Sequence, residues 1–272
     1  MQGTLIVIGV IIIGMALRSS KAKLFRKLGA LVYLLASGLA IYFITDNLIA
    51  AIAGVLIWFF LPWVELLTRI RKLRLPLNNK LQHRFPPNED HFPMADASIA
   101  ALEREGFEHV ANSGWDWAGA SQSYQFFWHP EQCCIAALCL CVQENISFSF
   151  VNITSRDKSG SLWRTSNFPF SPTLKESPNV QHNQIKCCAS SLADILSSHH
   201  YFITLHGACI DDLIIPDPES VEQDIEQDMR RQIDYNLEAG IITLTGDGHF
   251  KYSFRGLLFL WKQFIKDMIR LC

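Results

Sequence analysis

The chain has 272 residues, 49% of them hydrophobic, and a mean hydropathy of +0.15. This composition excludes a disordered chain and is typical of a protein that is part membrane and part globular. The formal net charge is −2, but residues 1–80 carry ten Lys/Arg and two acidic residues, whereas residues 81–272 carry 14 Lys/Arg and 24 acidic residues. Because phosphate binding needs a positively charged surface, we expect no nucleic acid as a partner of the acidic part.

Residues 4–17 form an apolar run that is followed by basic residues and preceded by none. A secretory signal carries its positive charge before the apolar core and ends in small residues at a cleavage site, and this run has neither feature. The pattern therefore predicts an uncleaved transmembrane helix. Because the run lies near the lower length limit of about 17 residues, a re-entrant or interfacial segment is the alternative.

Residues 28–45 and 48–67 are two further apolar runs, and each is long enough to span a bilayer as a helix. Asp46 and Asn47 between them predict a tight polar turn. Small residues allow two backbones to approach closely, and we expect them at the contact between the two helices. They are Ala36, Ser37, Gly38 and Ala40 in the first run and Ala51, Ala53 and Gly54 in the second. Glu65 and Arg69, four residues apart, are expected to pair.

Basic residues flank the hairpin on both sides, at 18–27 and 69–74, and cytoplasmic loops are the ones enriched in Lys and Arg. This predicts an integral protein of the plasma or inner membrane with its N-terminus outside and residues 75–272 in the cytoplasm. The glycosylation motifs at Asn145 and Asn152 would matter only in the opposite orientation. Eight cysteines, several of them adjacent as in Cys133–Cys134 and Cys187–Cys188, do not form a secreted disulfide pattern.

The sequence divides into an anchor at 1–74, a linker at 75–94, an α+β domain at 95–210 and a helix–hairpin–helix unit at 211–272. In the α+β domain, the pattern predicts an antiparallel meander with helices packed on one face. The expected elements are a helix at 95–105, strands at 124–128, 133–142, 146–155 and 161–165, a loop at 168–179 and a helix at 190–205. Strand 133–142 is apolar on both faces, which predicts a central strand covered on both sides.

In the last unit, Asp217 and Pro218 predict the start of a helix that ends at Gly240, because Asp caps helices and Pro favours the first turn. Residues 241–252 predict a hairpin that turns at 246–248, and residues 254–271 a final helix. The segment 238–252 is similar to the end of a winged-helix unit and covers less than a fifth of the chain. A membrane-tethered regulator of this kind is one alternative function.

The final helix has a broad apolar face opposite Lys262, Lys266 and Arg270. A basic amphipathic helix with Trp and Phe on its apolar side can lie in the headgroup layer of a bilayer. The residues that we expect at the membrane interface are Trp261, Lys262, Phe264, Lys266 and Arg270. The alternative is that the apolar face packs on the domain or on a second copy of the chain.

The candidate chemistry is limited to a group of His and Cys residues. His199, His200 and His206 lie close in sequence to Cys187, Cys188 and Cys209, but the spacing differs from that of zinc sites. We therefore expect no metal and no cofactor, and no catalytic residue is identified. Trp115, Trp117, Trp128 and Trp163 are expected to lie in a core, at an interface or around a pocket.

The leading hypothesis is a non-enzymatic, membrane-anchored protein whose partners are the lipid bilayer and either a protein, a small ligand or a second copy. The runner-up is a membrane-tethered hydrolase that uses the His/Cys group, for example Cys209 with His206 and Asp211 or Asp212.

Overall fold

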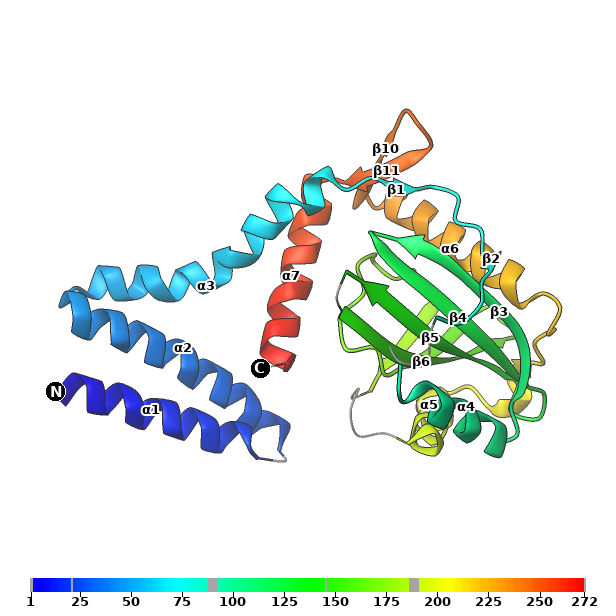
Figure 1. Cartoon of the computed structure of the whole chain (residues 1–272), viewed down its shortest axis with the longest axis horizontal. Coiled ribbons are helices and arrows are strands. Elements are labelled where there is room, and N and C mark those ends of the chain that lie inside the picture. The colour runs from blue at the N-terminus through cyan, green and yellow to red at the C-terminus, as the bar shows by residue number, and fades with distance from the viewer. Residues whose placement is uncertain (1, 21, 88–91, 145, 186–190, 272) are drawn as a thin grey trace.

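The computed structural model describes residues 2–20, 22–87, 92–144, 146–185 and 191–271. Its N-terminal part is a set of antiparallel helices: α1 (Gln2–Arg18), α2 (Lys23–Thr45) and α3 (Leu48–Thr68) (Figure 1). Two apolar stretches, Lys27–Thr45 and Leu48–Lys72, are long enough to cross a membrane, whereas the apolar helix Gly3–Arg18 is shorter. The structure thus shows two helices that could span a bilayer, and α1 lies alongside α2.

The contact between α2 and α3 depends on small residues, as predicted. Gly38, Ala51 and Gly54 are buried there. Ala36 is also buried, but it lies one turn from Val32 and Tyr33, which contact Gly14 of α1, and Ala53 is exposed. A β-carbon on Gly38 would lie 2.8 Å from Val55 Cγ2, so a larger residue would push the helices apart. The predicted turn is also present, because the Asn47 side chain accepts hydrogen bonds from the backbone N–H groups of residues 49 and 50 at 2.8 and 3.3 Å.

The domain is built on a curved, mostly antiparallel sheet with the strand order β2-β3-β4-β5-β6-β7-β8 (Figure 1). Its strands are β2 (Gln82–His83), β3 (Glu108–Trp117), β4 (Ala120–His129), β5 (Cys134–Gln143), β6 (Ile146–Asp157), β7 (Leu162–Ser166) and β8 (Val180–Gln184). The pair β7–β8 is parallel, and β9 (Leu213–Ile214) pairs with the end of β6. The α+β fold with a mainly antiparallel sheet therefore agrees with the sequence pattern.

Helices cover both faces of this sheet: the two helices predicted within residues 95–210 share one face, as expected, and a helix of the C-terminal unit covers the other. On one face, α4 (Ala95–Arg104) and α5 (Leu192–Leu205) form a core with the sheet through Leu102 and Ile195. On the other face, α6 (Val221–Glu238) packs Val221 and Ile225 against Phe126 of β4. The narrow apolar stripe of α6 is enough to hold the helix on the sheet, because the strands beneath it are apolar there.

Strand β5 is buried on both faces, as its continuous apolar sequence predicts. Ala136 and Leu138 face α4 and α5, whereas Cys139 and Cys141 belong to a cluster on the opposite face.

Two strands and the start of one helix differ from the sequence pattern. Strands β3 and β8 were not predicted, because their sequences are rich in polar residues and their pairing with neighbouring strands defines them. Helix α6 begins at Val221 and not at Pro218, because residues 217–220 form a turn in which the Asp217 side chain accepts from the backbone N–H of Glu219 at 3.0 Å.

A second, smaller core joins the anchor to the domain. It lies around a three-stranded sheet of β1 (Leu75–Pro76), β11 (His249–Tyr252) and β10 (Ile242–Thr245), and it includes Leu66 of α3, which is fully buried. The hairpin β10–β11 confirms the predicted one. The segment 75–94 contains β1 and β2, each paired with a strand far away in sequence, so this part of the chain is tied to the fold at two points.

The final helix α7 (Phe254–Leu271) leaves this core and runs across the ends of the anchor helices, between them and the domain (Figure 1). Trp261 packs against Trp63 with ring centroids 6.3 Å apart, and its Nε1–H donates to the backbone oxygen of Phe59 at 2.8 Å. Helix α3 bends in this region, where Pro62 interrupts its hydrogen-bond ladder. The indole of Trp261 therefore bonds a backbone carbonyl within the bent turn.

Candidate functional site

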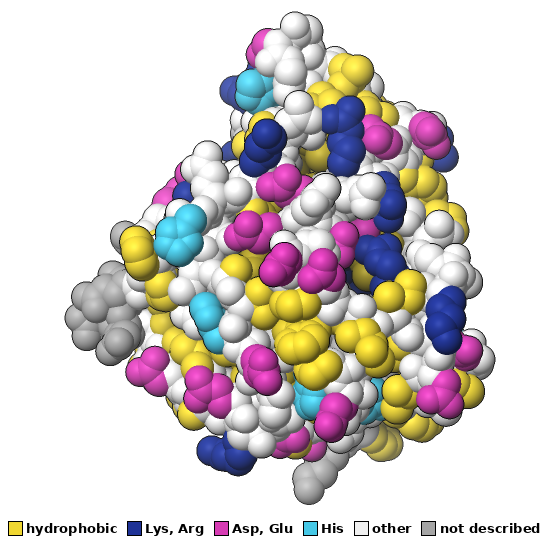
Figure 2. Space-filling view, turned by 90° about the vertical axis from the view of Figure 1, so that its right-hand side faces the viewer, with side chains coloured by type: hydrophobic (Ala, Val, Ile, Leu, Met, Phe, Trp, Pro, Cys, Tyr) yellow, Lys and Arg dark blue, Asp and Glu magenta, His cyan; other side chains and the backbone are white. Residues whose placement is uncertain are grey.

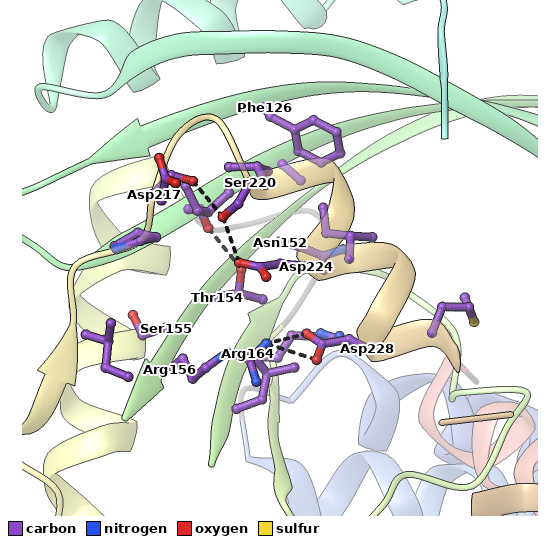
Figure 3. Close-up of a pocket in the computed structure, with 18 of the residues that line it drawn as sticks. Phe126, Asn152, Thr154, Ser155, Arg156, Arg164, Asp217, Ser220, Asp224 and Asp228 are labelled. Atoms are coloured by element: carbon purple, nitrogen blue, oxygen red, sulfur yellow. Dashed lines mark hydrogen bonds and ion pairs between the residues drawn. The ribbon is translucent and has the colours of Figure 1, made fainter. Parts of the chain in front are cut away.

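A cavity with a volume of about 420 Å³ lies between the sheet and α6 (Figure 3). Its walls come from β3 to β7, from the loop at 214–217 and from α6. The loop is held in place by the Nε1–H of Trp128, which donates to the backbone oxygen of Pro216 at 2.8 Å. A volume of this size is typical of a small-molecule site.

Strand alternation determines which side chains face this cavity. In an antiparallel sheet, directly paired residues point to the same face, and Phe126 pairs with Ala137, which in turn pairs with Asn152. The next row contains Ile135, Thr154 and Arg164. The cavity therefore has an apolar floor over β4 and β5 and a polar wall over β6 and β7.

One ion pair closes the polar end of the cavity. The Arg156 Nη2 atom of β6 lies 2.9 Å from both carboxylate oxygens of Asp228 on α6 (Figure 3). Both side chains are more than two-thirds buried. Because each charge has a partner, this pair holds α6 against the strand and leaves no charge for a ligand.

Arg164 of β7 also lines the cavity, but it makes no hydrogen bond or ion pair within the part of the chain that the structure describes. Its five N–H donors in a planar group are suited to carboxylate or phosphate. The side-chain amide of Asn152, which lines the same wall, likewise has no hydrogen-bond partner among the described residues. These groups are the ones available to a polar ligand.

The opposite rim is acidic and lies at the start of α6. Asp217 and Asp224 are exposed, and both line the cavity. The Ser220 hydroxyl donates to an oxygen of Asp224 at 3.3 Å, and Asp224 has no ion-pair partner within the described ranges (Figure 3). The charged lining thus comprises two arginines and three aspartates. Figure 2, a view of the domain from the side away from the anchor, shows hydrophobic and acidic side chains next to one another.

The His/Cys group does not come together in the structure. His199 is fully buried between α5 and the sheet, while His206 is exposed at the end of α5, where its Nδ1 atom bonds the backbone oxygen of Phe202 at 2.8 Å. Cys209 is exposed and makes no contact with His206 that would activate a thiol. Cys187 and Cys188 lie outside the described residues. Among the residues described, no group of three or more His, Cys, Asp or Glu could hold a metal ion.

The cysteines of β5 are inert structural residues. Burial raises the pKa of the Cys134 thiol to about 12 and that of Cys139 further still. Because the thiolate is the reactive form, neither side chain is a nucleophile at neutral pH.

The five residues predicted at the membrane interface all lie on α7, with different surroundings. Trp261 and Phe264 pack against the second core, and Arg270 donates to the side-chain oxygen of Gln184. Lys262 and Lys266 are exposed. Part of the helix therefore packs within the protein, on the anchor and the domain, and docking at a membrane surface stays a prediction.

Sequence patterns missed the cavity, because its arginines and its aspartates lie more than 50 residues apart along the chain. The single residue with a sequence signal is Trp115, which we expected in a core, at an interface or around a pocket, and which does line the cavity. Comparisons of the chain with protein-family models, with curated proteins and with solved structures find no match.

Proposed function

We propose that the chain is a membrane-anchored binding protein whose domain holds a small ligand in the cavity beneath α6. The observation that supports this best is the unpaired guanidinium of Arg164 on the wall of a cavity with an apolar floor. Pockets that combine an apolar lining with a few polar groups are typical of small-molecule sites. Among the described lining residues, the Ser155 hydroxyl lies 3.1 Å from the imidazole of His199, but both side chains are buried and the hydroxyl donates to the backbone oxygen of Cys133, so binding without chemistry is favoured.

The proposal includes the membrane topology. Helices α1, α2 and α3 cross the plasma or inner membrane, so that the start of α1 lies outside and the domain lies in the cytoplasm. Supporting this, Arg18, Arg69, Arg71 and Lys72 lie at the ends of the anchor helices nearer the domain, while the turn at Asp46 lies at the far end (Figure 1). Basic residues are enriched on the cytoplasmic side of membrane helices.

Filling the cavity tests the binding function. The variant Ala137→Phe places a ring on the cavity floor, and Ala97→Phe places the same ring on the exposed surface of α4. Water-soluble fragments that bind the full chain in lipid nanodiscs, measured by saturation-transfer NMR, are expected to lose binding in Ala137→Phe and to keep it in Ala97→Phe.

A thermal-unfolding measurement shows whether each variant is folded, since the added ring can cost about 1–3 kcal/mol in a packed site. If fragments bind the folded Ala137→Phe variant as well as the original chain, the cavity is not the binding site.

A further inference from the structure

The charges that remain unpaired around the cavity have opposite signs. The charges of Arg156 and Asp228 balance each other. Within the described ranges, neither Arg164 on one wall of the cavity nor Asp224 on its rim has an ion-pair partner. Asp217 lies beside the Asp224 rim and is bonded only to local backbone. A ligand of one sign would therefore leave a charge of the cavity without a partner.

The positions of these two groups leave room for a ligand between them. Arg164 pairs in the sheet with Thr154, so their side chains lie next to each other on the cavity face. Asp224 reaches from α6 toward the strands that carry Asn152 and Thr154 (Figure 3). Nevertheless, Arg164 and Asp224 do not form an ion pair, so their charged atoms stay more than 4.0 Å apart.

A ligand with a single negative charge would approach Arg164 past the aspartates of the rim, which repel it. A ligand with a single positive charge would satisfy Asp224 but would cover Arg164 and remove its water, which is costly for an unpaired charge. A zwitterion avoids both costs, because its carboxylate and its ammonium each meet a group of opposite charge.

The cavity also offers an apolar surface beside these charged groups. Phe126, Ile135 and Ile225 line it from the sheet and from the helix. Burying an apolar group here contributes about 25 cal/mol for each Å² removed from water.

We propose that the cavity binds a small zwitterion with an apolar body, that is, an apolar amino acid or a short apolar peptide. Its carboxylate bonds Arg164, its ammonium bonds Asp224, and its side chains lie on Phe126 and Ile135. This inference rests on the proposed binding function and specifies its ligand.

The test compares related probes on the full chain in nanodiscs by isothermal titration calorimetry. L-leucine and L-leucyl-L-leucine carry both charges, N-acetyl-leucyl-leucine lacks the ammonium, and leucyl-leucine amide lacks the carboxylate. At least one of the two zwitterions is expected to bind, and for the dipeptide each blocked form is expected to bind at least about tenfold more weakly, as the loss of one charge-assisted hydrogen bond predicts.

Variants connect each loss to its residue. In Arg164→Gln, blocking the carboxylate of the dipeptide should no longer weaken its binding. In Asp224→Asn, blocking its ammonium should no longer weaken its binding. The matched controls are Arg104→Gln on α4 and Asp234→Asn on the outer side of α6, both exposed and away from the cavity. These controls should bind the zwitterions as the original chain does.

Equal affinity for the zwitterionic and blocked dipeptides would overturn the inference, and so would the absence of binding for all of these probes. In either case the binding function itself is decided separately, by whether Ala137→Phe abolishes fragment binding.

Discussion

His199 lies at the centre of a buried polar contact between α5 and the sheet. Its Nδ1 atom is 2.9 Å from the Thr165 hydroxyl and its Nε2 atom is 3.1 Å from the Ser155 hydroxyl, which also donates to the backbone oxygen of Cys133. A neutral imidazole has one donor and one acceptor, so it satisfies both hydroxyls when Nε2 carries the proton. Burial, together with neighbouring His200, lowers the pKa of His199 from 6.5 to about 3.

This lowered pKa predicts a pH-dependent stability. The unfolded chain binds a proton at His199 below pH 6.5 and the folded chain does not, so the stabilisation is present above that pH and is lost as the pH falls toward 3. The loss approaches about 1.4 kcal/mol per pH unit in this range. Between pH 7 and pH 5, the unfolding temperature of His199→Gln is expected to fall less than that of the original chain.

His206→Gln is the matched control, because His206 is exposed at the end of the same helix. It should shift with pH as the original chain does. Equal shifts in all three proteins would contradict the role assigned to His199.

At the scale of elements, α7 connects the anchor and the domain. Phe254 stacks on Trp63 with ring centroids 6.1 Å apart, and Asp267 accepts from the backbone N–H and hydroxyl of Ser171 at 2.8 and 2.6 Å. Phe254, Leu258 and Ile269 remain exposed along the helix, together with Lys262 and Lys266. An exposed surface of apolar and basic residues at the ends of membrane helices is suited to anionic headgroups.

We expect α7 to exchange its backbone hydrogens more slowly in nanodiscs that contain phosphatidylglycerol than in nanodiscs of phosphatidylcholine alone. The reason is that each lysine near an anionic surface contributes about 1 kcal/mol of attraction. The double variant Lys262→Glu/Lys266→Glu should lose this protection, as measured by hydrogen–deuterium exchange of residues 254–271. Lys251→Glu on the exposed side of β11 is the control and should retain it. Exchange that does not depend on the lipid would count against headgroup docking.

At the scale of the whole molecule, the basic end of α3 lies next to the domain, where Arg69 pairs with Glu144 at 3.8 Å. The second core fixes the domain to the end of α3 through Leu66, and Arg74 pairs with Asp247 of the hairpin at 3.2 Å. The domain is therefore joined to the C-terminal end of α3 (Figure 1).

Thiol labelling tests the topology. Cys209 is exposed on the domain, and a membrane-impermeant maleimide is expected to label it only after intact cells are permeabilised. Leu48→Cys, introduced at the exposed turn between α2 and α3, is expected to react in intact cells when combined with Cys209→Ser. Labelling of Cys209 without permeabilisation would reverse the orientation proposed here.

Much of the architecture could be predicted from local patterns. Residues 28–45 and 48–67 became α2 and α3 because long apolar runs with polar turns allow few other structures, and residues 133–142 became a doubly buried strand for the same reason. Strands β3 and β8 could not be predicted, since their polar sequences become strands only by pairing with β4 and β7.

The sequence by itself determined the membrane anchor, the charge separation, the α+β class and the amphipathic character of α7, because each depends on residues close together in the chain. The tertiary structure alone decided that α6 covers the second face of the sheet and encloses a cavity. It also decided that, within the described part of the chain, Arg164 and Asp224 have no ion-pair partner around this cavity, while His199 is buried and His206 and Cys209 are exposed. These outcomes depend on contacts between distant segments, whose geometry follows from packing and not from local sequence.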